Sequence, residues 1–417
     1  MRWIWFCCCL LLLTTLKVQA DSAEQLFARY EPALLQVRVL EKASGAKSSI
    51  GTGFVLEQPN LLVTNYHVVS EAVLFPDKYQ LEYLAVNQQK GALTVLAVDV
   101  VNDLALVQTD YQPEHRFSIQ TEKPVQGATL YSLGNPHDLG MILVPGTYNG
   151  LQKYSYYPRI HFTGAVNAGM SGGPTVDASG KVVGVNVASA GNQLGFLVPA
   201  DALQRLLASY QQHQNDADLP KQIAQQLFDS QQKMFSEILA ADWQLKDFGP
   251  GKVPDEVVSF IRCWGESNVE KSKDQLKKVA AFCSQGEEIF LSQQFSTGRI
   301  EMQFEWLHGA GLHPLQFFNR YQQNISSANA DNQASKEDVT PFECQHKVVQ
   351  QANGQHAKTI FCVRAYRNFA ALFDVLYLAA SLDHQQQGVI SHFTLSGVSQ
   401  ENAQAFARKF SEAVLWQ

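Results

Sequence analysis

Short apolar runs fill the first half of the chain, from about residue 34 to residue 199, and Gly, Pro, Asn and Asp separate them. No helical period lies between these runs, which are Leu35–Leu40, Gly53–Leu56, Leu61–Thr64, Leu93–Val98, Leu104–Val107, Thr129–Leu133, Val182–Val187 and Phe196–Val198. Many short strands at this spacing are typical of an all-β barrel or a pair of barrels. We predict such an architecture here, with a short helix at Ala23–Arg29 before it and another from about Asp201 after it.

The pattern changes after a polar stretch at Tyr210–Pro220, which we interpret as a domain boundary. Apolar residues then recur at helical spacing and predict a long amphipathic helix to about Trp243. Beyond it we expect strands and helices at Val257–Cys263, Ile289–Phe295, Arg299–Trp306, Leu315–Gln323 (helix), Leu372–Ala380, Gly388–Leu395 and Gln400–Leu415 (helix). This grouping predicts an α+β domain with an antiparallel sheet.

The first twenty residues have the features of a secretory signal. Arg2 precedes the apolar run Trp3–Leu13, and the small residues Val18 and Ala20 suit a signal-peptidase cut. The run is shorter than the about 20 residues that span a bilayer, although an uncleaved anchor remains the alternative. We therefore expect a signal at 1–20, domains at 21–210 and 215–417, a periplasmic or secreted protein, and no stable membrane span after cleavage.

In the oxidising compartment that the export signal implies, the cysteines suggest two disulfides. Three of the seven lie in the expected signal, and four remain: Cys263, Cys283, Cys344 and Cys362. Two β-rich runs between the last two meet at Asn353-Gly354, a strong hairpin signal that brings Cys344 and Cys362 within one residue of register. We prefer 344–362 with 263–283 among the three connectivities, and four free thiols are the alternative.

Charge and known ligand motifs exclude several classes of function. The chain has 32 basic and 39 acidic residues and a net charge of -7, so no extended cationic surface indicates a nucleic-acid partner. No HExxH, CxxC or EF-hand spacing occurs, so we expect no metal and no cofactor.

Three segments of the first half carry candidate chemistry. They are Gly51–Leu56 with Thr64–Val69, then Asn102–Val107, then Gly169–Pro174. In this order they resemble the GxGF…TNxHV, D-LA and GNSGGP motifs of trypsin-like serine endopeptidases of the HtrA/Deg type, over roughly residues 30 to 205. The resemblance implies a mainly β fold, with a chymotrypsin-like double β-barrel protease domain followed here by the α+β C-terminal domain.

The same residues make chemical sense as a catalytic set. Serine is a weak nucleophile at neutral pH and needs a base, for which imidazole has a suitable pKa. We assign Ser171 as the nucleophile, His67 as the base and Asp103 as the carboxylate that orients it, with Asp99 as the competing candidate. Gly169 and Ser171 are expected to offer their N–H groups to the oxyanion. His137 and His161 are expected to be surface or structural residues.

One departure from the family pattern concerns the nucleophile loop. Met170 stands where the family has Asn, and the mature chain has no Ile-Val-Gly-Gly start for a zymogen switch. We therefore hypothesise that the Gly169 peptide is weakly held and that the free enzyme is latent until substrate or a partner orders the loop.

Specificity is partly readable by resemblance. The pocket walls are expected from Ala165 and Val166 before the nucleophile and from Val187 and Ala188 on a later strand. Neither segment contains an acidic residue, so we expect cleavage after an apolar residue such as Val, Leu or Ala and not after Lys or Arg.

The sequence thus predicts an exported serine endopeptidase that acts on protein or peptide substrates. A catalytically inactive, chaperone-like binding protein on the same fold is the rival, and an esterase is a third reading. The second half has no recognisable PDZ signature. Its candidate roles are to bind substrate, to tether the enzyme, to cap the active site or only to stabilise the protease. The oligomeric state stays open.

Overall fold

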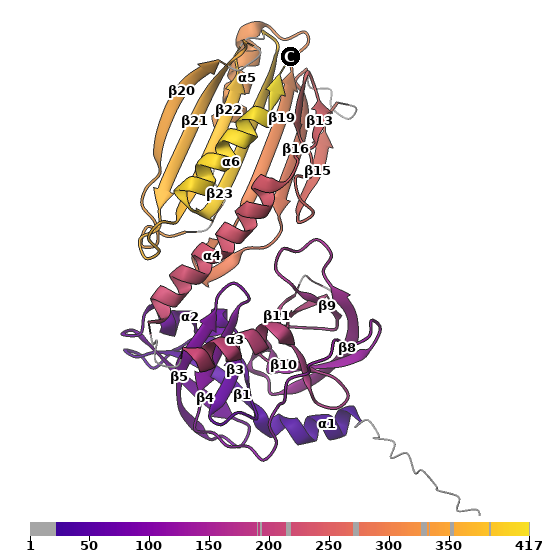
Figure 1. Ribbon diagram of the computed structural model, residues 1–417, viewed down its shortest axis with the longest axis vertical. Coiled ribbons are helices and arrows are strands. Elements are labelled where there is room, and N and C mark those ends of the chain that lie inside the picture. Colours follow the sequence, from indigo (N-terminus) through magenta and orange to yellow (C-terminus); the bar gives the residue numbers. More distant parts are fainter. Residues whose placement is uncertain are drawn as a thin grey trace, which may run out of the picture.

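The computed structural model describes residues 22–189, 191, 194–213, 218–269, 275–326, 332, 334–350, 354–382 and 385–416. The expected signal at 1–20 lies outside these residues. The chain forms two parts, with the first half below and a long sheet above, and helix α4 (Leu219–Ala240) runs between them (Figure 1). No helix among the described residues has the length and apolarity to cross a bilayer.

The first half begins with a capped helix and a closed barrel. Ser22 caps helix α1 (Ala23–Tyr30) by accepting a hydrogen bond from the Gln25 N–H, as a capping box does. The barrel has the order β1-β2-β3-β6-β5-β4, and its strands are β1 (Leu34–Glu41), β2 (Lys47–Val55), β3 (Leu61–Thr64), β4 (Tyr79–Ala85), β5 (Lys90–Asp99) and β6 (Leu104–Gln108). Helix α2 (Tyr66–Leu74) connects β3 to β4.

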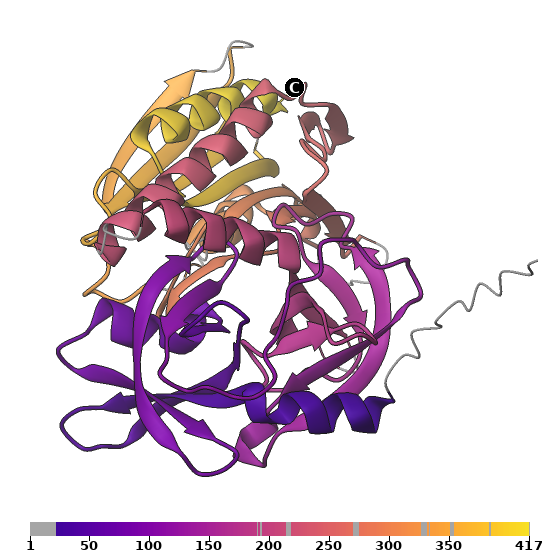
Figure 2. The ribbon, with the colours of Figure 1, turned by 60° about the horizontal axis from the view of Figure 1, so that its bottom comes forward.

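A second closed barrel follows, and the two lie side by side in Figure 2. Its order is β10-β11-β12-β9-β8-β7, and its strands are β7 (Thr129–Gly134), β8 (Ile142–Leu151), β9 (Ile160–Thr163), β10 (Pro174–Val176), β11 (Val182–Ser189) and β12 (Gly195–Pro199). Helix α3 (Ala200–Gln212) closes this half. The predicted double β-barrel is confirmed.

The second half is built on a seven-stranded antiparallel sheet of order β15-β16-β19-β23-β22-β21-β20. Its strands are β15 (Ile261–Ser267), β16 (Lys277–Gln285), β19 (Ile300–His308), β20 (Glu343–Gln350), β21 (His356–Ala365), β22 (Phe373–Ser381) and β23 (Gln387–Val398). Helices α4 and α6 (Gln400–Ala413) cover one face (Figure 1). The helix α5 (Pro314–Ser326) and a small sheet of β13 (Leu245–Phe248), β14 (Gly251–Pro254) and β24 (Leu415–Trp416) complete it.

Both disulfides fasten an edge strand of this sheet. Cys263 on β15 is bonded to Cys283 on β16, and Cys344 on β20 to Cys362 on β21, which confirms the preferred pairing. Each pair sits directly opposite in the strand register, and the pairing of β20 with β21 ends at Gln350 and His356.

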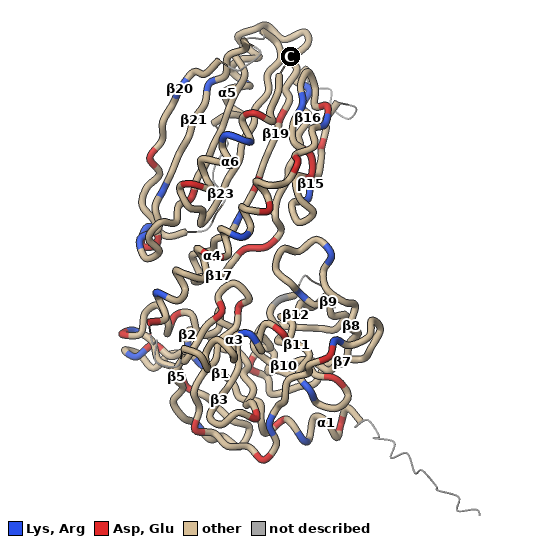
Figure 3. The backbone as a smooth tube through the Cα atoms, viewed as in Figure 1, with Lys and Arg blue, Asp and Glu red and all other residues tan. Residues whose placement is uncertain are grey.

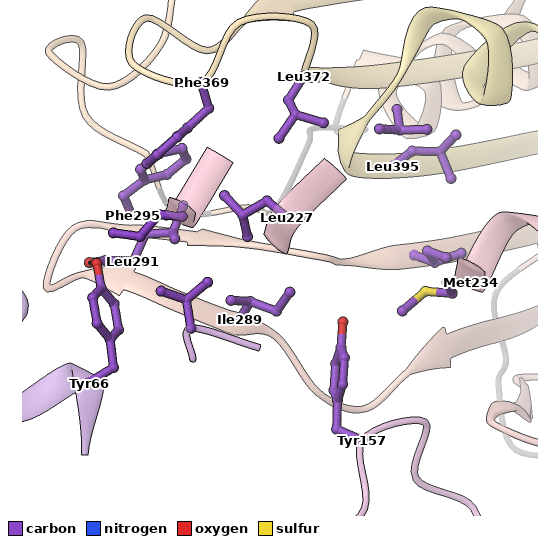
Figure 4. Close-up of a cluster of buried hydrophobic side chains, with 14 of the residues drawn as sticks. Tyr66, Tyr157, Leu227, Met234, Ile289, Leu291, Phe295, Phe369, Leu372 and Leu395 are labelled. Atoms are coloured by element: carbon purple, nitrogen blue, oxygen red, sulfur yellow. Dashed lines mark hydrogen bonds between the residues drawn. The ribbon is translucent and has the colours of Figure 1, made fainter. Parts of the chain in front are cut away.

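The prediction of a single strand at Ile289–Phe295 is wrong. The segment Ile289–Phe295 is a tight hairpin of β17 (Ile289–Ser292) and β18 (Phe295–Thr297), because Gln293 and Gln294 make a turn in its middle. The hairpin packs on α2 of the first barrel, and its buried side chains join the two halves in one apolar cluster (Figure 4). Charged residues of both signs are interspersed over both halves (Figure 3).

Candidate active site

His67 and Asp103 form a hydrogen-bonded pair in the first barrel. His67 is the second residue of α2, and Asp103 stands in the turn between β5 and β6. The His67 Nδ1 lies 2.6 Å from Asp103 Oδ2, and the His67 backbone N–H donates to Asp103 Oδ1 over 2.8 Å. One carboxylate thus holds both the ring and the first turn of the helix that carries it.

Asp103 is set in place by an unusual backbone conformation. Its φ is 62°, a region that Asp and Asn tolerate better than most residues. The side chain of Asn65, the residue before α2, donates to the Asp103 carbonyl over 2.7 Å. Asp99, the competing candidate, accepts from the backbone and side-chain nitrogens of Asn102 instead.

The electrostatics of the pair favour a basic imidazole. Burial by itself lowers the pKa of His67, but the charge and the hydrogen bond of Asp103 outweigh it, so the pKa of His67 is raised above its ordinary value. Burial and, to a smaller degree, the same carboxylate raise the pKa of Tyr66.

The loop that carries Ser171 packs against the segment that carries His67. The Thr52 N–H on β2 donates to the Ser171 carbonyl over 2.8 Å. Gly172 has φ 83°, and a Cβ there would overlap the Thr64 hydroxyl and lie 2.8 Å from the Asn65 nitrogen. Among the described residues no hydrogen bond joins the Ser171 hydroxyl to His67, as is common before substrate tightens such a site.

Two N–H groups beside Ser171 are available to an anion. The carbonyl of Ala168 accepts from the His137 N–H over 2.9 Å. Because carbonyl and N–H point in opposite directions across a trans peptide, the Gly169 N–H points away from His137. In the described part of the chain, neither the Gly169 N–H nor the Ser171 N–H donates to another protein group. The conformation needs glycine, since φ is 92° and a Cβ would overlap the Asn135 carbonyl.

Met170 anchors the loop by burial. Its side chain is 0% exposed and packs in the core of the second barrel with Leu130, Tyr148, Ile160, Phe162, Val166, Val183 and Leu197. An apolar anchor thus stands where the family has a polar side chain. The hypothesis of a latent enzyme remains a prediction, but these contacts and the peptide orientation favour a loop that is already ordered.

Two buried polar residues that the sequence analysis missed hold the same loop. The Thr52 hydroxyl donates to the Gly169 carbonyl over 2.7 Å and accepts from the Asn135 N–H over 3.0 Å. The Asn186 side chain donates to the Met170 carbonyl over 3.2 Å and accepts from the hydroxyls of Ser132 and Thr175. The available signals were Asn186 among the otherwise apolar residues and glycine of positions 182–188, and a Thr between Gly51 and Gly53.

We expect Thr52→Val to loosen the nucleophile loop, because it removes the partner of the part-buried Gly169 carbonyl and of the buried Asn135 N–H. The free energy of unfolding should fall by about 1–3 kcal/mol. Labelling of Ser171 by a fluorophosphonate should slow by up to about 10²-fold, the effect of a misplaced oxyanion donor. The matched control is Thr52→Ser, which keeps the hydroxyl. Equal labelling rates for the two variants would contradict this role of Thr52.

An open cleft of about 930 Å³ lies beside the pair and is lined by both halves of the chain. His67, Asp103 and Val187 lie in it, together with His161, which the sequence predicted to be a surface or structural residue. Val166 does not line this cleft, because its side chain is 5% exposed and belongs to the barrel core.

Two closed six-stranded barrels, one with a His–Asp pair and the other with a Gly-x-Ser-Gly-Gly loop, define a chymotrypsin-like peptidase domain. Residues 51–185 match the family model described as a trypsin-like peptidase domain. The human protein "Serine protease HTRA3" is 26% identical over 178 residues, which are 40% of this chain and 39% of that protein. "Protease Do-like 1, chloroplastic" of Arabidopsis thaliana is 28% identical over 183 residues, again 40% of this chain and 39% of the relative.

A solved serine endoprotease from Yersinia pestis is 23% identical and covers 45% of this chain and 66% of its own, with a TM-score of 0.40. The chain spans about two fifths of the length of the curated relatives it matches, as the 39% coverage of the human protein illustrates. The first half of the chain thus contains a match to a trypsin-like peptidase domain and is similar to HtrA-type serine proteases.

Proposed function

We propose that the protein is an exported serine endopeptidase that hydrolyses peptide bonds through an acyl-enzyme intermediate. The observation that carries the proposal is the hydrogen bond between His67 and Asp103 beside a serine loop with two unused N–H groups. We further propose a periplasmic or secreted location and a role in envelope protein quality control or processing.

In this mechanism the Ser171 hydroxyl attacks the substrate carbonyl while His67 Nε2 takes its proton. Asp103 keeps the other proton of the ring on Nδ1 and stabilises the imidazolium that forms. The N–H groups of Gly169 and Ser171 stabilise the oxyanion, where one such donor is worth about 3–4 kcal/mol. His67 then returns the proton to the leaving amine, and water, activated by His67, releases the acyl group from Ser171.

The test is casein hydrolysis by the purified mature protein beside Ser171→Ala, together with fluorophosphonate labelling of both. We expect hydrolysis and labelling by the wild type alone, without any added ligand. Equal casein hydrolysis by both proteins, or none by either, would contradict the endopeptidase. A strong preference for short acyl esters over casein would instead favour the esterase, and slow labelling that a peptide accelerates would favour a latent enzyme.

A further inference from the structure

The cleft beside His67 has a wall that belongs to the C-terminal domain. Residues 285–290, which connect β16 to the first residues of β17, line the cleft together with His67 and Val100 of the first barrel. We call residues 285–290 the C-terminal wall. A substrate bound beside His67 therefore meets residues that no barrel supplies.

Phe290 is the residue of this wall whose ring contacts His67. Successive side chains of a strand alternate between its two faces, and the neighbours Ile289 and Leu291 are 5% and 0% exposed in the core. Phe290 therefore points the other way, and its ring packs edge-on against the His67 ring with 5.9 Å between centroids. The Phe290 ring therefore lies directly beside the imidazole assigned as the catalytic base.

Hydrogen bonds hold the wall and the residue that follows it to both barrels. The Tyr66 hydroxyl, from the residue before His67, donates to the Leu291 carbonyl over 3.1 Å, and Figure 4 shows its ring directed at the hairpin. On the second barrel, the Ser155 hydroxyl donates to Glu287 over 2.5 Å. The position of Phe290 relative to His67 is thereby fixed before substrate arrives.

The C-terminal domain also contacts a second margin of the cleft, the loop of residues 152–159 before β9. The Arg262 guanidinium lies 4.2 Å from the centre of the Tyr154 ring. The rings of Tyr156 and Phe260 are 4.8 Å apart. Both margins of the cleft thus depend on contacts across the two halves of the chain.

The chemistry that the wall offers beside His67 is apolar. Its two carboxylates have partners, since Glu287 accepts from Ser155 and Glu288 pairs with Arg299 over 3.0 Å. Phe290 faces a cleft that is also lined by Val100 and Val101. Resting on the proposed endopeptidase function, we propose that the C-terminal wall is part of the substrate site and that Phe290 selects a large apolar substrate side chain beside the cleaved bond.

The test profiles the cleavage sites of the full-length protein and of Phe290→Ala in a mixture of denatured proteins by mass spectrometry. The profile identifies the substrate position with the strongest preference for apolar residues. We then measure kcat/KM for pairs of peptides that carry Leu or Ala at that position. Truncating Phe290 should lower the Leu-over-Ala preference by about 10-fold. Phe290→Leu retains part of the apolar bulk and should lower the preference by a smaller factor than Phe290→Ala, and it serves as the second variant where Phe290→Ala fails to fold. The matched control is Phe318→Ala, an exposed phenylalanine on α5.

An unchanged preference in Phe290→Ala and Phe290→Leu, in a wild type that cleaves, overturns this inference alone. An equal fall in kcat/KM for the Leu and the Ala peptides also overturns it. Such a fall would mean that Phe290 only supports His67 and does not select the substrate side chain. A wild type that neither cleaves nor labels at Ser171 overturns the proposed endopeptidase and this inference together.

Discussion

Asp103→Asn should lower kcat by about 10⁴-fold while the protein stays folded. Asn tolerates the φ of 62° at this position, and its carbonyl oxygen can still accept from the His67 backbone N–H. Its amide nitrogen then faces His67 Nδ1 and donates to it. The ring proton moves to Nε2, and the base can no longer accept the proton of Ser171.

The same substitution should change the pH dependence. Catalysis needs neutral His67, so kcat/KM of the wild type should rise with pH through the pKa of His67, above the ordinary value of about 6.5. Without the carboxylate, burial dominates and lowers the pKa of His67. The midpoint of the pH profile of Asp103→Asn should therefore lie lower.

Asp99→Asn is the matched control for the Asp103 prediction. Asp99 has its hydrogen bonds with Asn102 and none with His67, so its substitution should leave kcat within a few fold of the wild type. Steady-state kinetics of both variants on one peptide substrate decide the assignment. A loss in Asp99→Asn as large as that in Asp103→Asn would contradict it.

Met170→Asp should destabilise the second barrel by about 3–5 kcal/mol, the effect of an unpaired charge in a buried site. Met170 is 0% exposed among apolar side chains, so a carboxylate there loses water and gains no partner. Urea unfolding measures the loss of stability. Displacement of the adjacent Gly169 peptide should also slow fluorophosphonate labelling of Ser171.

Met170→Leu provides the control for this second prediction. It keeps the volume and the apolar character, so it should cost less than about 1.5 kcal/mol and leave labelling near the wild-type rate. If Met170→Asp unfolded within about 1 kcal/mol of the wild type, burial of Met170 would not be what anchors the loop.

The local sequence pattern predicted the features that depend on residues close together in the chain. The short apolar runs predicted the barrel strands, and the hairpin signal predicted the bond between Cys344 and Cys362. Motif order brought forward His67 and Asp103, which the structure joins by hydrogen bonds. It left Asp99 open, because both carboxylates lie in one segment and only the turn geometry separates them.

The local sequence pattern does not predict contacts between distant segments. Tyr66 and Leu291 are 225 positions apart, and nothing in the apolar pattern of either says which surface it meets. Thr52 and Gly169 are separated by 117 positions, and their hydrogen bond follows from how two barrels pack. The hairpin turn at Gln293 and Gln294 was missed because it contains no Gly, Pro, Asn or Asp.

The disulfide between Cys263 and Cys283 closes two residues before Gln285, where the C-terminal wall begins. It ties the edge strand β15 to the strand that leads into the cleft. A chain in which this bond has not formed lacks the covalent tie at the start of the wall. If the wall has the role proposed for it, we expect reduction of this bond to loosen the edge of the substrate cleft.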